Sequence, residues 1–556
     1  MASQWEALGR RVNGRLIRPQ SPFAPTASSA ARAEAFEQLK NPYFLGDQPA
    51  LTQTSGWAGA WQSRPSAYAV VAESAADVAA AVDFARKHRL RLVVKGGGHS
   101  YQGTSNAADS LLIWTRRMNR AELHDAFVPH GCAFAPQPAV SLGAGCMWID
   151  AYSAVTTHGG RYVQGGGCTT VGVAGLVQSG GFGSFSKRWG TAASHLLEAE
   201  VVTADGRVRL ANACTNPELF WALKGGGGGS FGVVTRITLR THDLPETFGA
   251  VLGRIKAADG ATYLALIAEA MRFYRRALFN PHWGEQMSLR NGDTLGISMV
   301  FQGLTQEQAE ATWAPFLAWV KARPEYTLVE PPRAIAMPAR HFWDADFFRA
   351  HSPGLMVEDE RPGAPRHHMV WAGDREQVGW CLHAYQSAWM PAALLDDSAL
   401  SRLAEALHRA AQAWDVELHF NKGLAGAPAD AISHAHDTAT HPDALGAFAL
   451  ALVGAYGAPA FAGMPADASN GPAQVRRGVD GVSRSIAALR AVAPHAGSYV
   501  AESDYFLDDW QRGFWGAHYP RLAAAKQQYD PEGLFTVHHG VGSERWNAEG
   551  FDPRPR

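Results

Sequence analysis

The sequence lacks an excess of charge of either sign and any long apolar run. Lys and Arg number 50 against 51 for Asp and Glu, so no net field attracts nucleic acid or an anionic membrane surface. No stretch is long and apolar enough to cross a bilayer, and no apolar run of a secretory signal follows the basic N-terminal residues. We therefore expect no nucleic-acid or membrane partner and, by default, a cytoplasmic location, with export after signal removal left open.

Cysteine is also scarce. The five cysteines stand at positions 132, 146, 168, 214 and 381, an odd number at wide spacing that predicts no disulfide framework and contains no CxxC pair for zinc. A lone cysteine most often packs as a small buried apolar side chain. We expect this of all but Cys168, whose glycine-rich surroundings suggest a chemical role.

Two familiar nucleotide-binding motifs are missing as well. The chain has no GxGxxG that follows a strand and opens a helix, and no GxxxxGK[ST]. A nicotinamide-binding doubly wound domain and a P-loop nucleotidase are therefore both disfavoured. Present instead are 57 glycines, many of them in blocks at 96–100, 164–168, 179–183 and 224–230. Strand-like apolar runs flank each block, so we interpret the blocks as loops that let the backbone approach a ligand, rather than as flexible linkers.

Histidines cluster at 366–369, 419–423 and 433–441. No carboxylate or cysteine completes a recognisable metal-binding spacing around them, so the sequence predicts no metal site. Residues 419–423 are expected to line a substrate cleft instead, because a strand places His419 and Asn421 on one face.

The length of 556 residues exceeds what one simple core organises, which favours two domains. A strand at 67–73, a helix capped by Ser74 and Asp77, and a second strand at 90–95 form a predicted βαβ unit that leads directly into the first glycine block. After Pro245 the pattern changes to longer helical stretches mixed with strands, which indicates a second, α+β domain.

Four separated segments together resemble one family. KGGGHSYQG at 95–103 resembles the pyrophosphate loop of the vanillyl-alcohol-oxidase type of FAD-binding fold. The segments at 161–190, 219–239 and 505–535 are similar, in the same order, to segments of its berberine-bridge-enzyme-like branch. Four matches in order are far more specific than one GGGH alone.

The resemblance implies an α+β fold. It would comprise a PCMH-type FAD-binding domain of two α/β subdomains and a substrate domain whose antiparallel sheet is covered by helices. We expect an N-terminal arm at 1–45, the FAD-binding domain at 46–245, the substrate domain at 246–494, and a C-terminal segment at 495–556 that returns to the FAD-binding domain.

By the same resemblance, His99 matches the histidine joined to the flavin 8α-methyl group and Cys168 the cysteine joined to flavin C6, so the expected cofactor is bicovalent FAD. Either side chain can add to an electron-poor ring held against it. The other expected contacts are Gly96, Gly97, Gly98, Ser100 and Gly103 around the diphosphate; Gly172, Gly175, Gly180, Gly181 and Gly183 along the isoalloxazine and ribityl side; and Gly232 and Val234 near the adenine. For any one glycine the alternative is a simple tight turn.

Hydride transfer from an alcohol requires a base for the hydroxyl proton. The family often carries a YxNYxD-like segment over the flavin, and the matching residues here read SYVAESD at 498–504. Tyr499 and Asp504 are kept, whereas Ala501 and Glu502 replace the asparagine and the second tyrosine. We interpret Glu502 as the candidate base with Tyr499 assisting; the alternative is a solvated surface glutamate.

Val171 matches a position beside the flavin edge where, in similar proteins, valine accompanies oxidase behaviour. The alternative is a core valine; Tyr152 and Tyr162 are weaker catalytic candidates. The sequence therefore favours an FAD oxidase that takes hydride from an alcohol or hemiacetal of a sugar or secondary metabolite and passes the electrons to O2, giving H2O2. A dehydrogenase, an oxidative cyclase, or a flavin-loaded binding protein remain alternatives, and neither the substrate nor the oligomeric state follows from the sequence.

Overall fold

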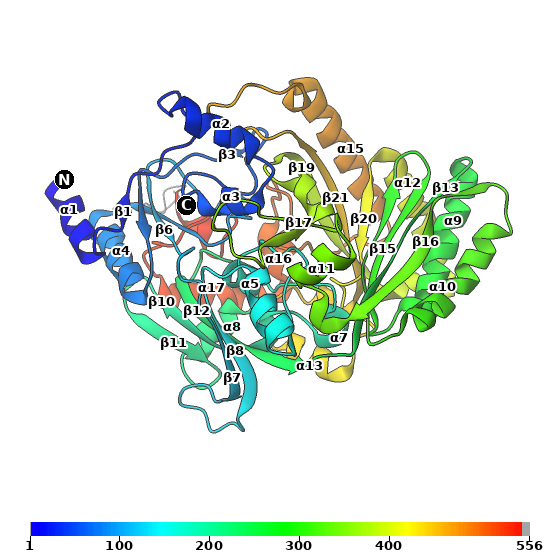
Figure 1. Cartoon of the computed structure of the whole chain (residues 1–556), viewed down its shortest axis with the longest axis horizontal. Helices are drawn as coiled ribbons and strands as arrows, with labels where there is room; N and C mark the ends of the chain where they lie inside the picture. The colour runs from blue at the N-terminus through cyan, green and yellow to red at the C-terminus, as the bar shows by residue number, and fades with distance from the viewer. Residues whose placement is uncertain (1, 548–556) are drawn as a thin grey trace.

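The computed structural model describes residues 2–547, so residues 548–556 of the expected C-terminal segment lie outside the described part. It confirms a mixed α+β architecture, built on three main sheets (Figure 1). Among the residues described, no helix is both long enough and apolar enough to cross a membrane.

The first sheet contains the predicted βαβ unit. Its strands, in the order β1-β4-β6-β5, are β1 (Leu16–Ile17), β4 (Tyr68–Val71), β6 (Ser110–Trp114) and β5 (Arg91–Lys95). Helix α4 (Ala75–His88) begins where predicted, because the Ser74 hydroxyl accepts from the backbone N–H of Asp77 and the Asp77 carboxylate accepts from that of Ser74. Strands β4, β6 and β5 are parallel, so β5 delivers the chain into the glycine block at one edge.

The N-terminal arm is more ordered than its weak periodicity indicated. It forms α1 (Ala2–Arg11), α2 (Ser29–Glu37) and α3 (Pro42–Asp47). The Trp5 ring stacks on Tyr68 with centroids 3.9 Å apart, which fixes α1 beside the first sheet.

The second sheet is antiparallel. Its strands are β11 (Val208–Asn212), β10 (Leu196–Val202), β12 (Val233–Asp243), β8 (Gln137–Gly143) and β7 (Ala121–Phe127), and β9 (Arg161–Val163) also pairs with β12. Strands β10 and β11 form a hairpin around the turn at Asp205. The β7–β8 hairpin projects at the bottom of the view in Figure 1.

Cys132 and Cys214 form a disulfide, which corrects the expectation that the cysteines are unpaired apolar side chains. The bond joins the end of the β7–β8 hairpin to the segment after β11, across 82 residues of sequence. Spacing alone did not reveal it, because the two segments become neighbours only when β7 and β11 take their places in one folded layer. Cys146, Cys168 and Cys381 are free.

The third sheet has nine strands. Their order is β16 (Tyr326–Pro338), β13 (Thr247–Ala257), β15 (Thr294–Gln302), β14 (Trp283–Arg290), β20 (Val416–His419), β21 (Ala447–Gly457), β19 (Cys381–Pro391), β2 (Gly56–Trp57) and β3 (Trp61–Gln62). Apart from the β19–β2 pair, neighbouring strands run antiparallel. Helices α9 (Gly260–Phe273), α10 (Gln306–Lys321), α12 (Asp397–Ala413) and α15 (Pro472–Arg490) share an apolar core with this sheet. In Figure 1, α9, α10 and α12 lie beyond it, away from the other two sheets.

Short elements fill the space between the sheets. They are α5 (Trp148–Tyr152), α6 (Val173–Gln178), α7 (Ser186–Trp189), α8 (Pro217–Leu223), α11 (Ala345–His351), β17 (Met356–Glu358), β18 (Met369–Trp371), α13 (Ala429–His436), α14 (Asp443–Gly446), α16 (Trp510–Trp515) and α17 (Tyr519–Tyr529). The C-terminal helices pack on the second sheet's layer: the Trp515 indole donates to the carbonyl of Gly225, and Lys526, paired with Asp530, donates to that of Ser230.

Candidate active site

Two glycine loops meet in backbone contact. A Cβ built on Gly97 would lie 2.6 Å from the amide nitrogen of Gly172, and one built on Gly172 would lie 2.8 Å from that of Gly97. Only glycine allows this approach without displacing a backbone. The loop after β5 and the turn before α6 are thereby held side by side.

His99 and Cys168 lie at this junction and contact the same hydroxyl group. Thr170 Oγ1 is 3.1 Å from His99 Nε2 and 3.5 Å from Cys168 Sγ. Burial lowers the pKa of His99 to about 4, so its imidazole is neutral near pH 7 and keeps a lone pair available. The contact with the Thr170 hydroxyl is made through Nε2.

The Cys168 thiol is kept protonated by its surroundings. Burial raises its pKa to about 12, and the nearby carboxyl of Asp374 adds to the effect. Burial also raises the pKa of Asp374 to about 7, which places that group in the range of a proton acceptor. The sequence offered no signal for Asp374, because it lies in a short 3-10 helix (Ala372–Gln377) 206 residues beyond the cysteine.

The other predicted cofactor contacts lie on the same loops or on the strand behind them. Gly96, Gly97, Gly98, Ser100 and Gly103 form the loop after β5; Gly172, Gly175, Gly180, Gly181 and Gly183 flank or belong to α6; Gly232 and Val234 lie at the start of β12. The loop after β5 is anchored by Lys95, whose ammonium donates to the carbonyls of Gln48, Pro49 and Leu51 at 2.8–2.9 Å.

The C-terminal segment brings Glu502 to this junction. Gln102, in the His99 loop, donates to the backbone oxygen of Ser503 at 3.0 Å. Tyr499 and Glu502 share one turn, in which the Glu502 N–H donates to the Tyr499 carbonyl. The Tyr499 hydroxyl accepts from the N–H of Gly181 at 3.3 Å, so this phenol is directed to the predicted flavin-contacting turn.

Lys422 is a site residue that the sequence reasoning did not single out. Its ammonium donates to the Glu502 carboxylate, and both side chains are largely buried. The residue stands in the 419–423 segment, next to His419 and Asn421, which the sequence predicts to line a cleft. The Glu502 carboxylate therefore has a protein partner in Lys422, and its side chain is only 21% exposed.

Glu285, in β14, is a second carboxylate at the site that the sequence did not indicate. Ser184 donates to its Oε1 at 2.5 Å and Asn421 lies 3.5 Å from the same oxygen. Burial raises the pKa of Glu285, whereas Lys422 opposes the rise. Its backbone φ of 62° is unusual for a residue with a side chain, and such strain gathers at functional sites.

Two tyrosines belong to the same group of side chains. The rings of Tyr101 and Tyr385 lie 5.0 Å apart. Burial raises the pKa of both phenols, and the charge of Glu502 raises each further. Tyr101 also responds to Cys168, so it lies between the glycine junction and Glu502.

Tyr152, Tyr162 and Val171, the remaining catalytic candidates, make hydrogen bonds or packing contacts within the protein core. Tyr152 donates to the Gly166 carbonyl at 2.6 Å and Tyr162 donates to Gln164 at 2.7 Å, both deep in the core. Val171 packs partly buried against the same core, and its carbonyl accepts from the N–H of Trp148.

Several buried polar atoms near the junction have no partner in the protein. They are Gln102 Oε1, both side-chain polar atoms of Asn106, His419 Nδ1 and Asn421 Oδ1. Buried polar groups are normally hydrogen-bonded, so unpaired ones converging on a glycine cradle fit a polar ligand. The donor set is suited to FAD: glycine-loop amides for a diphosphate, amide and imidazole groups for a ring system, and two nucleophiles at one edge.

Comparison with known proteins identifies the family and the fold of the chain. Residues 66–212 match the FAD binding domain model, and residues 498–542 match the berberine and berberine-like model. The FAD-linked oxidoreductase easE of Claviceps purpurea is 33% identical over 88% of this chain and 95% of its own length. The VAO-type flavoprotein MtVAO615 from Myceliophthora thermophila C1 superposes with a TM-score of 0.79, at 26% identity over 99% of this chain and 97% of its own.

A glucooligosaccharide oxidase from Acremonium strictum shares the fold, with a TM-score of 0.65 and 18% identity over 86% of this chain and 92% of its own. Its structure is described as carrying 6-S-cysteinyl, 8α-N1-histidyl FAD. From the curated relatives, the two family models and the fold, the chain is an enzyme that belongs to the berberine-bridge-enzyme-like branch of the PCMH-type FAD-linked oxidoreductases.

Proposed function

We propose that the enzyme holds FAD through two covalent bonds, from His99 and Cys168, and oxidises an alcohol or hemiacetal with O2 as the final acceptor. The observation that carries the proposal is the meeting of His99 and Cys168 at Thr170, with Glu502 brought to the same junction by the Gln102–Ser503 hydrogen bond. A similarly attached flavin in the glucooligosaccharide oxidase supports it.

The two side chains differ in the protonation change that each needs before it can bond to the flavin. His99 is already a neutral nucleophile, because burial lowers its pKa to about 4, and its Nε2 contacts the Thr170 hydroxyl. Cys168 must first lose a proton, and Asp374 is the neighbouring base of suitable pKa. The glycine amides of residues 96–98 would hold the diphosphate, and the turn at 180–183 would border the ring system.

When bound, FAD supplies a two-electron acceptor for hydride. The chain's own contribution is the removal of the substrate's hydroxyl proton by Glu502. Lys422 fixes the orientation of that carboxylate by a hydrogen bond, and the Tyr499 hydroxyl, which accepts from Gly181, lies on the other side of the same turn. Glu285, with Ser184 and Asn421, presents further polar groups that suit the hydroxyls of a sugar-like or polyhydroxylated substrate.

An oxidase is favoured over a dehydrogenase by Val171, which the resemblance places where oxygen reaches the flavin edge. An acceptor other than O2, or oxidative ring closure, is the second candidate, because many relatives carry only the broader name FAD-linked oxidoreductase.

One substrate screen tests the proposal. Purified holoenzyme is mixed anaerobically with alcohols, mono- and oligosaccharides and polycyclic secondary alcohols, and flavin bleaching near 450 nm is followed. Air is then admitted and H2O2 is measured. Bleaching with stoichiometric peroxide supports the oxidase, and bleaching without peroxide supports the second candidate. If no donor both bleaches the wild type and fails to bleach a Glu502→Gln variant, the alcohol-oxidising assignment is removed.

A further inference from the structure

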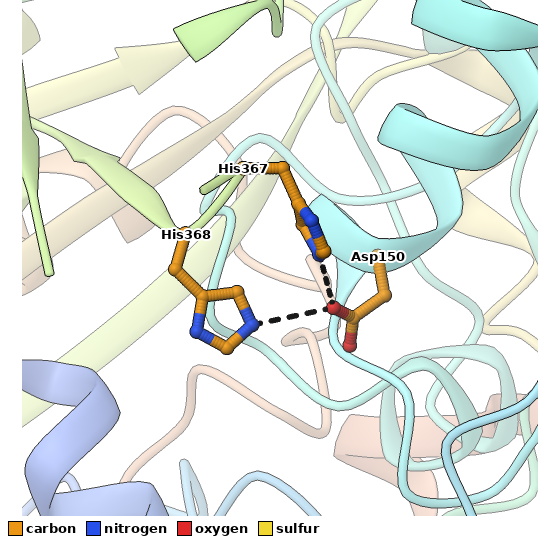
Figure 2. A group of neighbouring side chains, drawn as sticks. All are labelled: Asp150, His367 and His368. Carbon is orange, nitrogen blue, oxygen red and sulfur yellow. Dashed lines mark hydrogen bonds and ion pairs between the residues drawn. The ribbon is translucent and has the colours of Figure 1, made fainter. Parts of the chain in front are cut away.

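A carboxylate and two imidazoles converge beside helix α5. Asp150, in α5, meets His367 and His368, which immediately precede β18 and lie 217 and 218 residues further along the chain. Asp150 Oδ1 is 2.9 Å from His367 Nε2 and 3.4 Å from His368 Nε2. Figure 2 shows the two ring nitrogens directed at one carboxylate oxygen, and the three ligand atoms lie within 4.8 Å of one another.

The second oxygen of Asp150 is held separately. Oδ2 accepts from the backbone N–H of Met147 at 2.8 Å and lies 3.8 Å from the guanidinium of Arg116. These contacts orient the carboxylate and leave Oδ1 to the histidines. Ligating carboxylates in metal sites are commonly oriented by such outer contacts.

His368 is oriented from its far side. Its ring stacks on Tyr43 with centroids 4.4 Å apart, and its Nδ1 faces the carboxylate of Asp359 at 3.8 Å. Asp359 is itself fixed by hydrogen bonds from Asn41 and Arg361. A carboxylate behind one ring nitrogen favours the tautomer that presents the other as a metal ligand. The side chain of His368 is only 5% exposed, and Nδ1 has no hydrogen-bond partner.

Burial lowers the pKa of His368, but its carboxylate neighbours Asp150 and Asp359 outweigh this effect and raise it overall, so either a proton on this imidazole or a bound cation balances the local charge. The carboxylates of Asp47, Asp150 and Asp359 face the guanidiniums of Arg116 and Arg361 in one connected group. With neutral imidazoles, three negative charges against two positive ones leave one negative charge, next to two ring nitrogens. That combination attracts a cation to Oδ1.

We infer that Asp150 Oδ1, His367 Nε2 and His368 Nε2 bind a divalent transition metal of the Zn²⁺ class. Two imidazoles and one carboxylate are a ligand set that this ion accepts, with water in its remaining positions. The side chain of His367 is 36% exposed, which provides a path from solvent. The inference is independent of the proposed oxidase activity.

The site would tie together segments next to Cys168. Ile149 donates its N–H to the carbonyl of Thr169 at 2.9 Å, and the Thr169 hydroxyl donates to the carbonyl of Met369 at 2.8 Å. A bound ion would cross-link α5 to the residues before β18 around the turn that contains Thr169. We therefore expect it to stabilise the fold, since a ligand that binds only the native state raises its stability.

The test measures Zn²⁺ binding to the holoenzyme. Metal-stripped wild type is dialysed against Zn²⁺, and the bound metal and the thermal midpoint are recorded. We expect one ion per chain and a higher thermal midpoint. His367→Ala, a change at a partly exposed residue, should lose both, whereas His351→Ala, on the exposed face of α11, should retain both. Asp359→Asn should weaken binding about tenfold to a hundredfold.

Equal Zn²⁺ binding by wild type and His367→Ala would overturn the inference, as would no binding by wild type. In the second case the three side chains form a proton-bridged cluster only. Flavin content, measured on the same samples, shows that a variant has folded and separates loss of metal from loss of structure.

Discussion

Lys422 and Glu502 form a buried ion pair that joins the segment after β20 to the C-terminal turn carrying Tyr499. The pair lies where the third, nine-stranded sheet faces the glycine loops. It fixes a carboxylate that an isolated loop would leave exposed to solvent. Breaking a buried pair by removing one partner leaves an uncompensated charge, which is costly. The two residues are therefore expected to act together.

Glu502→Gln should slow anaerobic flavin reduction by about a hundredfold to ten-thousandfold, the usual contribution of a general base. The isosteric amide keeps the volume but cannot accept the proton, so FAD content should not change. Stopped-flow absorbance measures the rate, and Glu405→Gln, an exposed change on α12, is the control. An unaltered reduction rate would remove Glu502 from the mechanism.

Lys422→Met should impair the same step, flavin reduction by substrate. The double variant should lose less than the sum of the two single effects, because the two residues are in contact.

The flavin should be attached to the protein through two covalent bonds, one from His99 and one from Cys168. Acid-precipitated wild type should stay yellow, and each of His99→Ala and Cys168→Ala should retain flavin through the remaining bond. Only the double variant should release the colour, because only it lacks both nucleophiles. Peptide mass spectrometry locates the adducts, and Cys381→Ala, at a free cysteine far along the chain, serves as the control. A colourless wild-type precipitate would contradict the bicovalent proposal.

Cys168 should react slowly with alkylating agents in protein expressed under riboflavin starvation. Because the pKa of the Cys168 thiol is about 12, the thiolate fraction should rise about tenfold per pH unit between pH 8 and 10, and the rate of iodoacetamide labelling should rise with it. An ordinary thiol of pKa about 8.5 would approach a plateau over the same range. Asp374→Asn removes a nearby negative charge that disfavours the thiolate, so labelling at pH 8 should become faster. A plateau near pH 9 in the wild type would show that the thiol is not suppressed.

Val171→Ile should slow reoxidation of the reduced flavin by O2 and leave reduction by substrate unchanged. One added methyl group is felt where packing is tight, and a tenfold slower reoxidation corresponds to about 1.4 kcal/mol in activation free energy. Stopped-flow mixing of reduced enzyme with aerated buffer measures it, and Val171→Ala should not slow the reaction. Equal reoxidation rates for all three proteins would exclude Val171 from controlling oxygen access.

The Cys132–Cys214 disulfide should stabilise the fold measurably. Closing an 82-residue span lowers the entropy of the unfolded chain by an amount worth about 4 kcal/mol in the chain-entropy model. The double Cys132→Ser, Cys214→Ser variant should therefore unfold at lower denaturant concentration. Thiol titration of the denatured, flavin-free protein should find three thiols before reduction and five after it. Five thiols without reduction would refute the bond.

Local chemistry in the sequence determined the elements and loops around the cofactor site. The helix after Ser74 was predictable because its capping groups lie three residues apart. The glycine blocks were predictable as loops of close approach because glycine is needed wherever backbones come into contact, as at Gly97 and Gly172. His99 and Cys168 gained meaning from these immediate neighbours, and the family resemblance followed from the same short segments.

Tertiary structure alone decided the pairings across long stretches of chain. Lys422 with Glu502, Ser184 with Glu285, Cys132 with Cys214 and Asp150 with His367 are separated by 80 to 217 residues. No periodicity or capping rule connects positions so far apart, because their approach depends on how three sheets pack. The carboxylate chemistry of the site and the histidine cluster are therefore properties of the packed fold, whereas the cradle that holds the cofactor is already present in the order of the residues.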